Sequence, residues 1–290
     1  MAASIPGLRR EARLTLGWIL SPPWGDAMNL FPTAWYRGEI VPTDSLPIQP
    51  AWEPSESRSA GVFTTTRTFR TNRRVAFWRR HQLRLFESIQ IFGGDGRPYP
   101  SESELFEWMD SLNNLDVCVR INLVIGERPW AVARPLPKTP MPTRLAFSSE
   151  PASADRRLKT VGANWRRRAQ QEAESQGVWD VVALDSMGLV CDASNTNLCY
   201  RVGRKWWTPQ SDSLLPGVVR AALLEHGLVE ERRVTVDELL AADEIVASNS
   251  VRGIVPIHEV EGRVFTPGEA TKRLQEWFET AAVQHAVTET

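Results

Sequence analysis

Apolar and polar positions alternate in ways that predict two strands and two helices in the first half of the chain. From Val62 to Phe69, apolar residues alternate with β-branched threonines, a period of two that indicates a strand. The apolar run Val117–Ile125 predicts a second strand. A helix is expected over 80–92, ended by glycines, and a second one begins at Ser101, where Glu104 completes a capping box. These elements together predict a small α+β unit.

The second half shows short apolar runs separated by turn residues, and helical stretches between them. Apolar residues follow Lys159 at helical spacing, and this helix should end at Gly177. The segments Asp180–Leu184 and Leu189–Cys191 predict two strands around a turn. An apolar stripe over 274–281 predicts a C-terminal helix. The expected fold class is therefore α+β, with a small α+β domain and a larger strand-rich domain with helices.

A proline-rich segment separates the two halves. Residues 134–142 hold four prolines in nine positions, which favours an extended, semi-rigid connection. We therefore expect an N-terminal extension over 1–33, the small domain over 34–133, a linker over 134–142 and a large domain over 143–290. The extension contains an apolar run, 14–20, that is too short to span a bilayer.

Composition and charge narrow the class of partner. The formal net charge is -1, so no global field favours nucleic acid or an anionic membrane. The three cysteines show no C-x-x-C spacing and the histidines no H-x-x-x-H pair, so we expect no metal site and a reducing cytoplasm. Amine chemistry has four candidate side chains: Lys138, Lys159, Lys205 and Lys272.

Four short motifs follow one another after the linker. Lys159 lies in R-L-K-T, just before a helix, and Asp192 is followed five positions later by an asparagine. The segment 215–220 reads L-P-G-V-V-R, and 248–256 contains S-N-S followed by G-I-V-P. In this order they resemble the fold-type IV enzymes that use pyridoxal 5′-phosphate (PLP), the class IV aminotransferase family. That family includes branched-chain and D-amino-acid aminotransferases and aminodeoxychorismate lyase.

The resemblance implies a role for each motif. Lys159 would carry PLP as a Schiff base and serve as the catalytic amine. Asp192 would pair with the pyridinium nitrogen and keep it protonated, so that the ring acts as an electron sink. Family members usually have Glu here, and Asp is one methylene shorter. The phosphate would lie against a helix start, a neighbouring loop and an H-x-x-R-L-x-x-S helix. The residues so assigned are Arg84, Gly217, Val218, Val219, Asn249 and Ser250.

Two further arginines are candidates for substrate binding. Arg67 matches the family's F-E-T-x-R strand, with Thr64 in place of the Glu. Arg120 falls where branched-chain enzymes carry Y-x-R, with Cys118 in place of the Tyr. Arg120 could meet a substrate carboxylate or remain in a structural ion pair, and both alternatives stay open. Trp165 is displaced by one residue from the family's G-N-Y tyrosine.

Each motif taken singly also has a structural explanation. Lys159 could be a solvated lysine, Asp192 an Asx-turn residue and Gly217 an ordinary helix start. Their common order favours a PLP enzyme, and the resemblance implies a homodimer with a small amino substrate. The leading hypothesis is 4-amino-4-deoxychorismate lyase, which releases pyruvate and 4-aminobenzoate. The alternatives are a branched-chain or D-amino-acid transaminase, and a homologue without catalysis.

Overall fold

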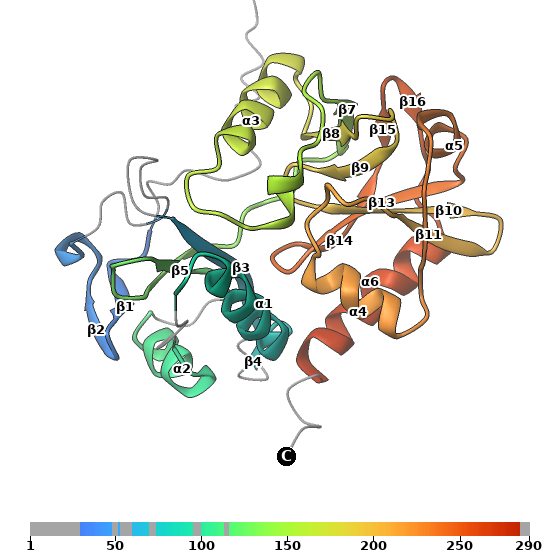
Figure 1. Ribbon diagram of the computed structural model, residues 1–290. Coiled ribbons are helices and arrows are strands. Elements are labelled where there is room, and N and C mark those ends of the chain that lie inside the picture. The colour runs from blue at the N-terminus through green and yellow to red at the C-terminus, as the bar shows by residue number, and fades with distance from the viewer. Residues whose placement is uncertain are drawn as a thin grey trace, which may run out of the picture.

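The computed structural model describes residues 30–47, 52, 60–69, 74–94, 100–112 and 116–284. Most of the expected N-terminal extension, with its apolar run, therefore lies outside the described residues. Within the described residues the chain forms three sheets, one from the first half and two from the second (Figure 1). The mixture of sheets and helices confirms the α+β class.

The first sheet is antiparallel throughout and has the strand order β2-β1-β6-β5-β3-β4. Its strands are β1 Thr33–Tyr36, β2 Glu39–Pro42, β3 Gly61–Phe69, β4 Arg74–Val75, β5 Val117–Val124 and β6 Trp130–Pro135. A short 3-10 helix, Thr43–Ser45, follows β2. Strand β6 includes the first two residues of the predicted linker.

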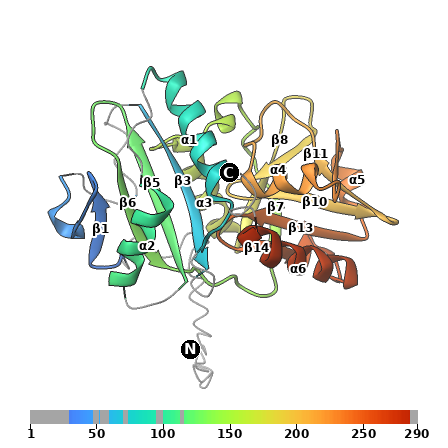
Figure 2. The same cartoon turned by 90° about the horizontal axis from the view of Figure 1, so that it is seen from below.

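Two helices pack on one face of this sheet, α1 Trp78–Ile91 and α2 Glu102–Ser111. The predicted capping box is present, because the Ser101 hydroxyl accepts from the Glu104 N–H while the Glu104 carboxylate accepts from the Ser101 N–H. Leu85 of α1 and Leu105 of α2 are fully buried against the sheet. Figure 2 shows the second half of the chain beside β3 and α1, where Phe69 and Phe77 pack against residues of α4 and α6.

The second half builds two five-stranded sheets, in the orders β12-β11-β10-β13-β14 and β16-β15-β7-β8-β9. Their strands are β7 Arg144–Phe147, β8 Asp180–Leu184, β9 Val190–Ala193, β10 Asn197–Val202, β11 Lys205–Pro209, β12 Glu230–Arg232, β13 Glu244–Asn249, β14 Gly253–Ile257, β15 Glu259–Val260 and β16 Arg263–Val264. The helices are the 3-10 helix η2 Ala154–Arg157, α3 Asn164–Gln176, α4 Val218–Glu225, α5 Val236–Leu240 and α6 Glu269–Gln284.

Helices α4 and α6 pack on the sheet of β10 to β14 and form one core with it (Figure 1). Gly253, where β14 begins after the turn from β13, has φ +71°, and a Cβ there would meet the Phe278 ring at 2.6 Å. Only glycine allows both the turn and this approach of α6. Helix α3 ends as predicted, with Gly177 in the left-handed conformation.

The segment around Lys159 joins the two halves through backbone hydrogen bonds. The Phe63 N–H donates to the Lys159 carbonyl at 2.9 Å, and the Val161 N–H donates to the Gly61 carbonyl at 2.9 Å. Strand β3 therefore fixes the lysine at the boundary between the first sheet and the second half.

Among the described residues, no helix combines the length and the apolar character that a bilayer span requires.

Candidate active site

A pocket lies where strand β3 and helix α1 face strands β9, β10 and β13 and the start of α4. Its lining includes eight of the ten residues that the sequence nominated: Arg84, Lys159, Asp192, Gly217, Val218, Val219, Asn249 and Ser250. These residues are up to 166 positions apart in the chain, between Arg84 and Ser250, and only the fold brings them together. Among the described residues, no group of His, Cys, Asp or Glu side chains is placed to hold a metal ion.

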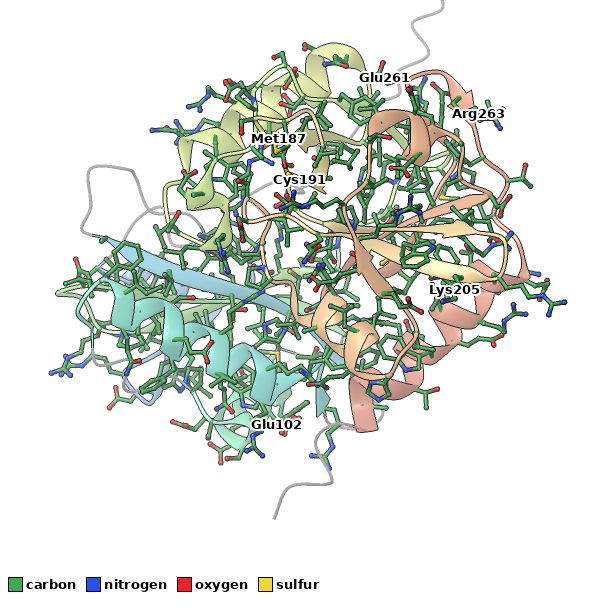
Figure 3. All side chains as sticks on the ribbon, turned by 45° about the vertical axis from the view of Figure 1, so that its right-hand side comes forward. Glu102, Met187, Cys191, Lys205, Glu261 and Arg263 are labelled. Atoms are coloured by element: carbon green, nitrogen blue, oxygen red, sulfur yellow. The ribbon has the colours of Figure 1, made fainter. Side chains whose placement is uncertain are left out.

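Lys159 presents its amine at one side of this pocket. It follows η2, and its Nζ lies 4.9 Å from the centroid of the Phe63 ring. None of the other three lysines is among the described residues that line the pocket. Lys205, for example, is exposed on the periphery of the second half, where it pairs with Glu230 at 3.1 Å (Figure 3). Among the described lining residues, Lys159 is therefore the one lysine.

Asp192 lies in β9, and its two carboxylate oxygens have different surroundings. Oδ2 accepts the Leu215 N–H at 3.0 Å, whereas no described residue donates a hydrogen bond to the buried Oδ1. The Arg156 Nη1 lies 3.8 Å from Oδ1. Burial raises the pKa of Asp192 to about 7, although the charge of Arg156 acts to lower it. A positively charged N–H donor at Oδ1 would stabilise the ionised form.

The asparagine five positions after Asp192 holds the same loop. The Asn197 Nδ2 donates to the Leu215 carbonyl at 2.9 Å, so the N–H and the C=O of Leu215 are both bound by this motif. A Cβ at Gly217 would lie 1.8 Å from the Asn197 Oδ1, so only glycine fits there. The aspartate–asparagine motif and the L-P-G segment are therefore one physical unit that positions the start of α4.

The start of α4 forms part of the pocket wall. Gly217 is the N-cap and makes no side-chain capping hydrogen bond, and Val218 and Val219 line the pocket. The first N–H groups of a helix have no partner within it and carry its positive dipole end. Asn249, by contrast, has a structural task, because its Oδ1 accepts the N–H groups of Val251 and Arg252.

Arg84 reaches the pocket from α1 and is held by the residue that departs from the family pattern. Its Nη2 donates to the Thr64 Oγ1 at 2.9 Å, and that hydroxyl also contacts the His81 Nδ1 at 2.5 Å. Burial, followed by the charge of Arg166, lowers the pKa of Arg84 to about 10, so the guanidinium stays protonated at neutral pH. Burial also lowers the pKa of His81, which favours a neutral imidazole.

The two arginines nominated for substrate binding are not among the lining residues. Arg67 pairs with Glu279 at 3.2 Å and with Asp116 at 3.8 Å. Arg120 is buried, donates from Nε to the Asn122 Oδ1 at 2.9 Å, and stacks with its guanidinium carbon 3.5 Å from the centroid of the Phe63 ring. Their substrate role stays a prediction.

Three functional candidates were missed by the sequence analysis or given no role there. Arg166 and Trp165, in the first turn of α3, line the pocket, and Arg156 approaches Asp192. The guanidinium carbons of Arg156 and Arg166 lie 4.2 and 4.5 Å from the Trp165 ring. The sequence did carry a signal for Arg166. A positive charge in the first turn of a helix is repelled by the positive end of the helix dipole, so another interaction is expected to compensate it.

A family model and curated relatives match this chain. The family model described as "Amino-transferase class IV" matches residues 61–260. The branched-chain-amino-acid aminotransferase of Pseudomonas aeruginosa is 34% identical over 115 residues, which are 37% of this chain and 38% of that protein. The matched segment thus spans less than two fifths of this curated relative.

Solved structures show the same fold. A branched-chain aminotransferase from Thermoproteus uzoniensis, solved with norvaline, aligns with TM-score 0.73 and 24% identity, covering 88% of this chain and 96% of that one. A putative 4-amino-4-deoxychorismate lyase from Legionella pneumophila aligns with TM-score 0.66 and 20% identity, covering 76% and 91%. Because the family model covers more than half of the residues, this chain belongs to the class IV amino-transferase family and has its fold-type IV architecture.

Proposed function

We propose that this chain is a PLP-dependent enzyme that acts at the amino group of a small substrate, with Lys159 as its catalytic amine. One observation carries the proposal. Lys159 and Asp192, whose buried Oδ1 accepts no hydrogen bond from a described residue, line the same pocket, and residues at the N-terminus of α4 line it too. An amine, a buried acid and an anion site in one pocket match the three polar functions of PLP: an aldehyde, a ring nitrogen and a phosphate.

The buried polar atoms of the pocket fit such a ligand. They include Asp192 Oδ1, Trp165 Nε1 and Thr196 Oγ1, for which no described residue is a hydrogen-bond partner. Buried groups of this kind are costly unless a ligand or water satisfies them. A protonated ring nitrogen would satisfy Asp192, and anionic ligand oxygens would accept from Trp165 and Thr196. A branched-chain amino acid aminotransferase of the same fold, at TM-score 0.72 and 19% identity, was solved with pyridoxamine 5′-phosphate.

The residues of this chain would have separate roles in catalysis and cofactor binding. Lys159 would hold the cofactor and then move the proton at the substrate carbon as general base and acid. Asp192 would keep the ring nitrogen protonated. Arg84 and the N–H groups of Val218 and Val219 would bind the phosphate. When bound, the cofactor supplies an electron sink for negative charge at that carbon.

The reaction proposed first is the lyase reaction on 4-amino-4-deoxychorismate, which releases pyruvate and 4-aminobenzoate. The fold shared with the Legionella pneumophila structure and the loss of the Y-x-R tyrosine at Cys118 support it. Transamination is the second candidate, supported by the name of the Pseudomonas aeruginosa relative. Product analysis separates them, because the lyase forms pyruvate and an aromatic amine without a keto-acid acceptor. The proposal includes a homodimer in a reducing cytoplasm, as the family resemblance implies.

Borohydride reduction tests the cofactor proposal directly. Purified protein incubated with PLP should become yellow, lose that absorbance on reduction, and carry the reduced adduct on the peptide that contains Lys159. Lys159→Ala should abolish the adduct, whereas Lys205→Ala, a matched change on the surface, should leave it intact. A wild-type protein that stays colourless with PLP would instead support a homologue without catalysis.

A further inference from the structure

The second half of the chain contains another hollow, separate from the candidate active site. It has a volume of about 500 Å³ and shares no described lining residue with the pocket of Lys159. Its walls come from the hairpin of β10 and β11, at the edge of the second half, from the segment after α4 and from the start of α6 (Figure 1). Sites for small molecules commonly have volumes of roughly 300–1,000 Å³, so this space fits a compact organic ligand.

Four of the lining residues are apolar and continue into the core beneath them. Trp206 is 8% exposed and Leu274 is 4% exposed, and both belong to the core that α4 and α6 form with their sheet. Leu228 and Ala270 are half-buried and pack against the same core. An apolar ligand that covers this surface removes it from water, which favours binding. A ring also finds the flat indole of Trp206 as a partner.

The other described lining residues are arginines, and none of the described lining residues is acidic. Arg201, near the end of β10, is fixed by its neighbours, because its Nε donates to the Glu244 Oε1 at 2.7 Å. The Glu244 Oε2 accepts from the Gly268 N–H and from the Thr271 hydroxyl, both at 2.7 Å. This carboxylate is therefore held by the start of α6, and Arg201 joins the hairpin to that helix at the side of the hollow.

Arg204 and Arg273 bring two further charges to the hollow from different elements. Arg204 lies in the turn between β10 and β11, and Arg273 lies in α6. Both residues are exposed, so a ligand can reach their charges at a small desolvation cost. Of the acids nearby, Asp243 accepts the Gly203 N–H at 2.7 Å and Glu269 pairs with Lys272 at 2.6 Å. Like charges that share one hollow repel each other, and an anion between them reduces this repulsion.

We propose that this hollow binds an aromatic carboxylate, with the ring against the apolar lining and the carboxylate on Arg204 and Arg273. The apolar lining gives little to a small inorganic anion, and the arginines give little to a neutral ring. A guanidinium offers a carboxylate two parallel hydrogen bonds and can also stack on an aromatic face. The inference is independent of the proposed function, because it uses no residue of the Lys159 pocket.

Isothermal titration calorimetry with two matched probes tests the site. Protein saturated with PLP is titrated with indole-3-acetate, an aromatic acid, and with indole-3-acetamide, the neutral amide of the same shape. Wild type should bind the acid at least about fivefold more tightly, as expected for exposed charge pairs. Arg204→Gln and Arg273→Gln should each lower the affinity for the acid about threefold, with the affinities for the amide and for PLP unchanged.

Arg263→Gln provides the matched control, because it removes an exposed arginine from β16, in the other sheet of the second half (Figure 3). It should bind both probes as wild type does. Equal affinities for the acid and the amide would overturn the inference, as would no binding of the acid at millimolar concentration. An Arg204→Gln, Arg273→Gln double variant that binds the acid like the control would also overturn it. Competition between the acid and PLP would do so too, because it would place the acid in the Lys159 pocket.

Discussion

The substitution Asp192→Asn tests separately how this carboxylate affects PLP binding and how it affects the free energy of unfolding. The carboxyl is buried, and the one hydrogen bond that it accepts from the described residues comes from the Leu215 N–H at 3.0 Å. An asparagine Oδ1 can accept the same bond, and the side chain keeps nearly the same volume. The substitution therefore mainly removes a buried negative charge. We expect the cofactor-free variant to be more stable than wild type at alkaline pH and to bind PLP more weakly.

The magnitude follows from the pKa of Asp192. Burial raises that pKa from 3.8 to about 7, against the opposing charge of Arg156. The carboxyl therefore contributes stability that is fully present below pH 3.8 and is lost as pH rises through about 7. At 1.36 kcal/mol for each pKa unit, Asp192→Asn should gain about 4 kcal/mol at pH 8 and about 2 kcal/mol at pH 5.

Urea unfolding of the PLP-free protein at pH 5 and pH 8 measures this difference. Asp212→Asn is the matched control, because its side chain is 99% exposed and should change the free energy of unfolding little at either pH. PLP titration of both variants then measures the binding task. A gain that is the same at both pH values, or a destabilised Asp192→Asn protein at pH 8, would refute the reasoning. Destabilisation at pH 8 would show that the Arg156 contact stabilises the fold more than burial of the charge destabilises it.

Three other substitutions test the positioning of the site. Gly217→Ala places a methyl 1.8 Å from the Asn197 Oδ1 and should weaken PLP binding about tenfold or more in a titration; unchanged affinity would mean that the loop can move. Thr64→Val removes the acceptor that holds Arg84 at 2.9 Å and should lower PLP affinity and the free energy of unfolding, the latter by about 1–3 kcal/mol; an unaffected titration would assign Arg84 another support. Ser101→Ala should cost about 1 kcal/mol in urea unfolding through the lost helix cap, and a change in PLP affinity would contradict this purely local role.

The sequence determined the elements that depend on neighbouring residues. The capping box at Ser101 and the glycine end of α3 at Gly177 are local hydrogen-bond and backbone requirements, and both are present. The strand at Asp180–Leu184 has the predicted bounds. The motif order gave eight residues that line one pocket, because each motif is a short segment whose backbone must take one shape near a ligand.

Only the tertiary structure decided which side chains share that pocket. The Leu215 N–H donates to Asp192 of β9, and the Leu215 carbonyl accepts from Asn197 of β10. No local sequence pattern encodes these two contacts. Arg120 stacks behind Phe63, while Arg166 lines the pocket, although both are arginines in plausible sequence contexts. The direction of a long side chain depends on the packing of residues distant in the chain, and local spacing carries no record of that packing.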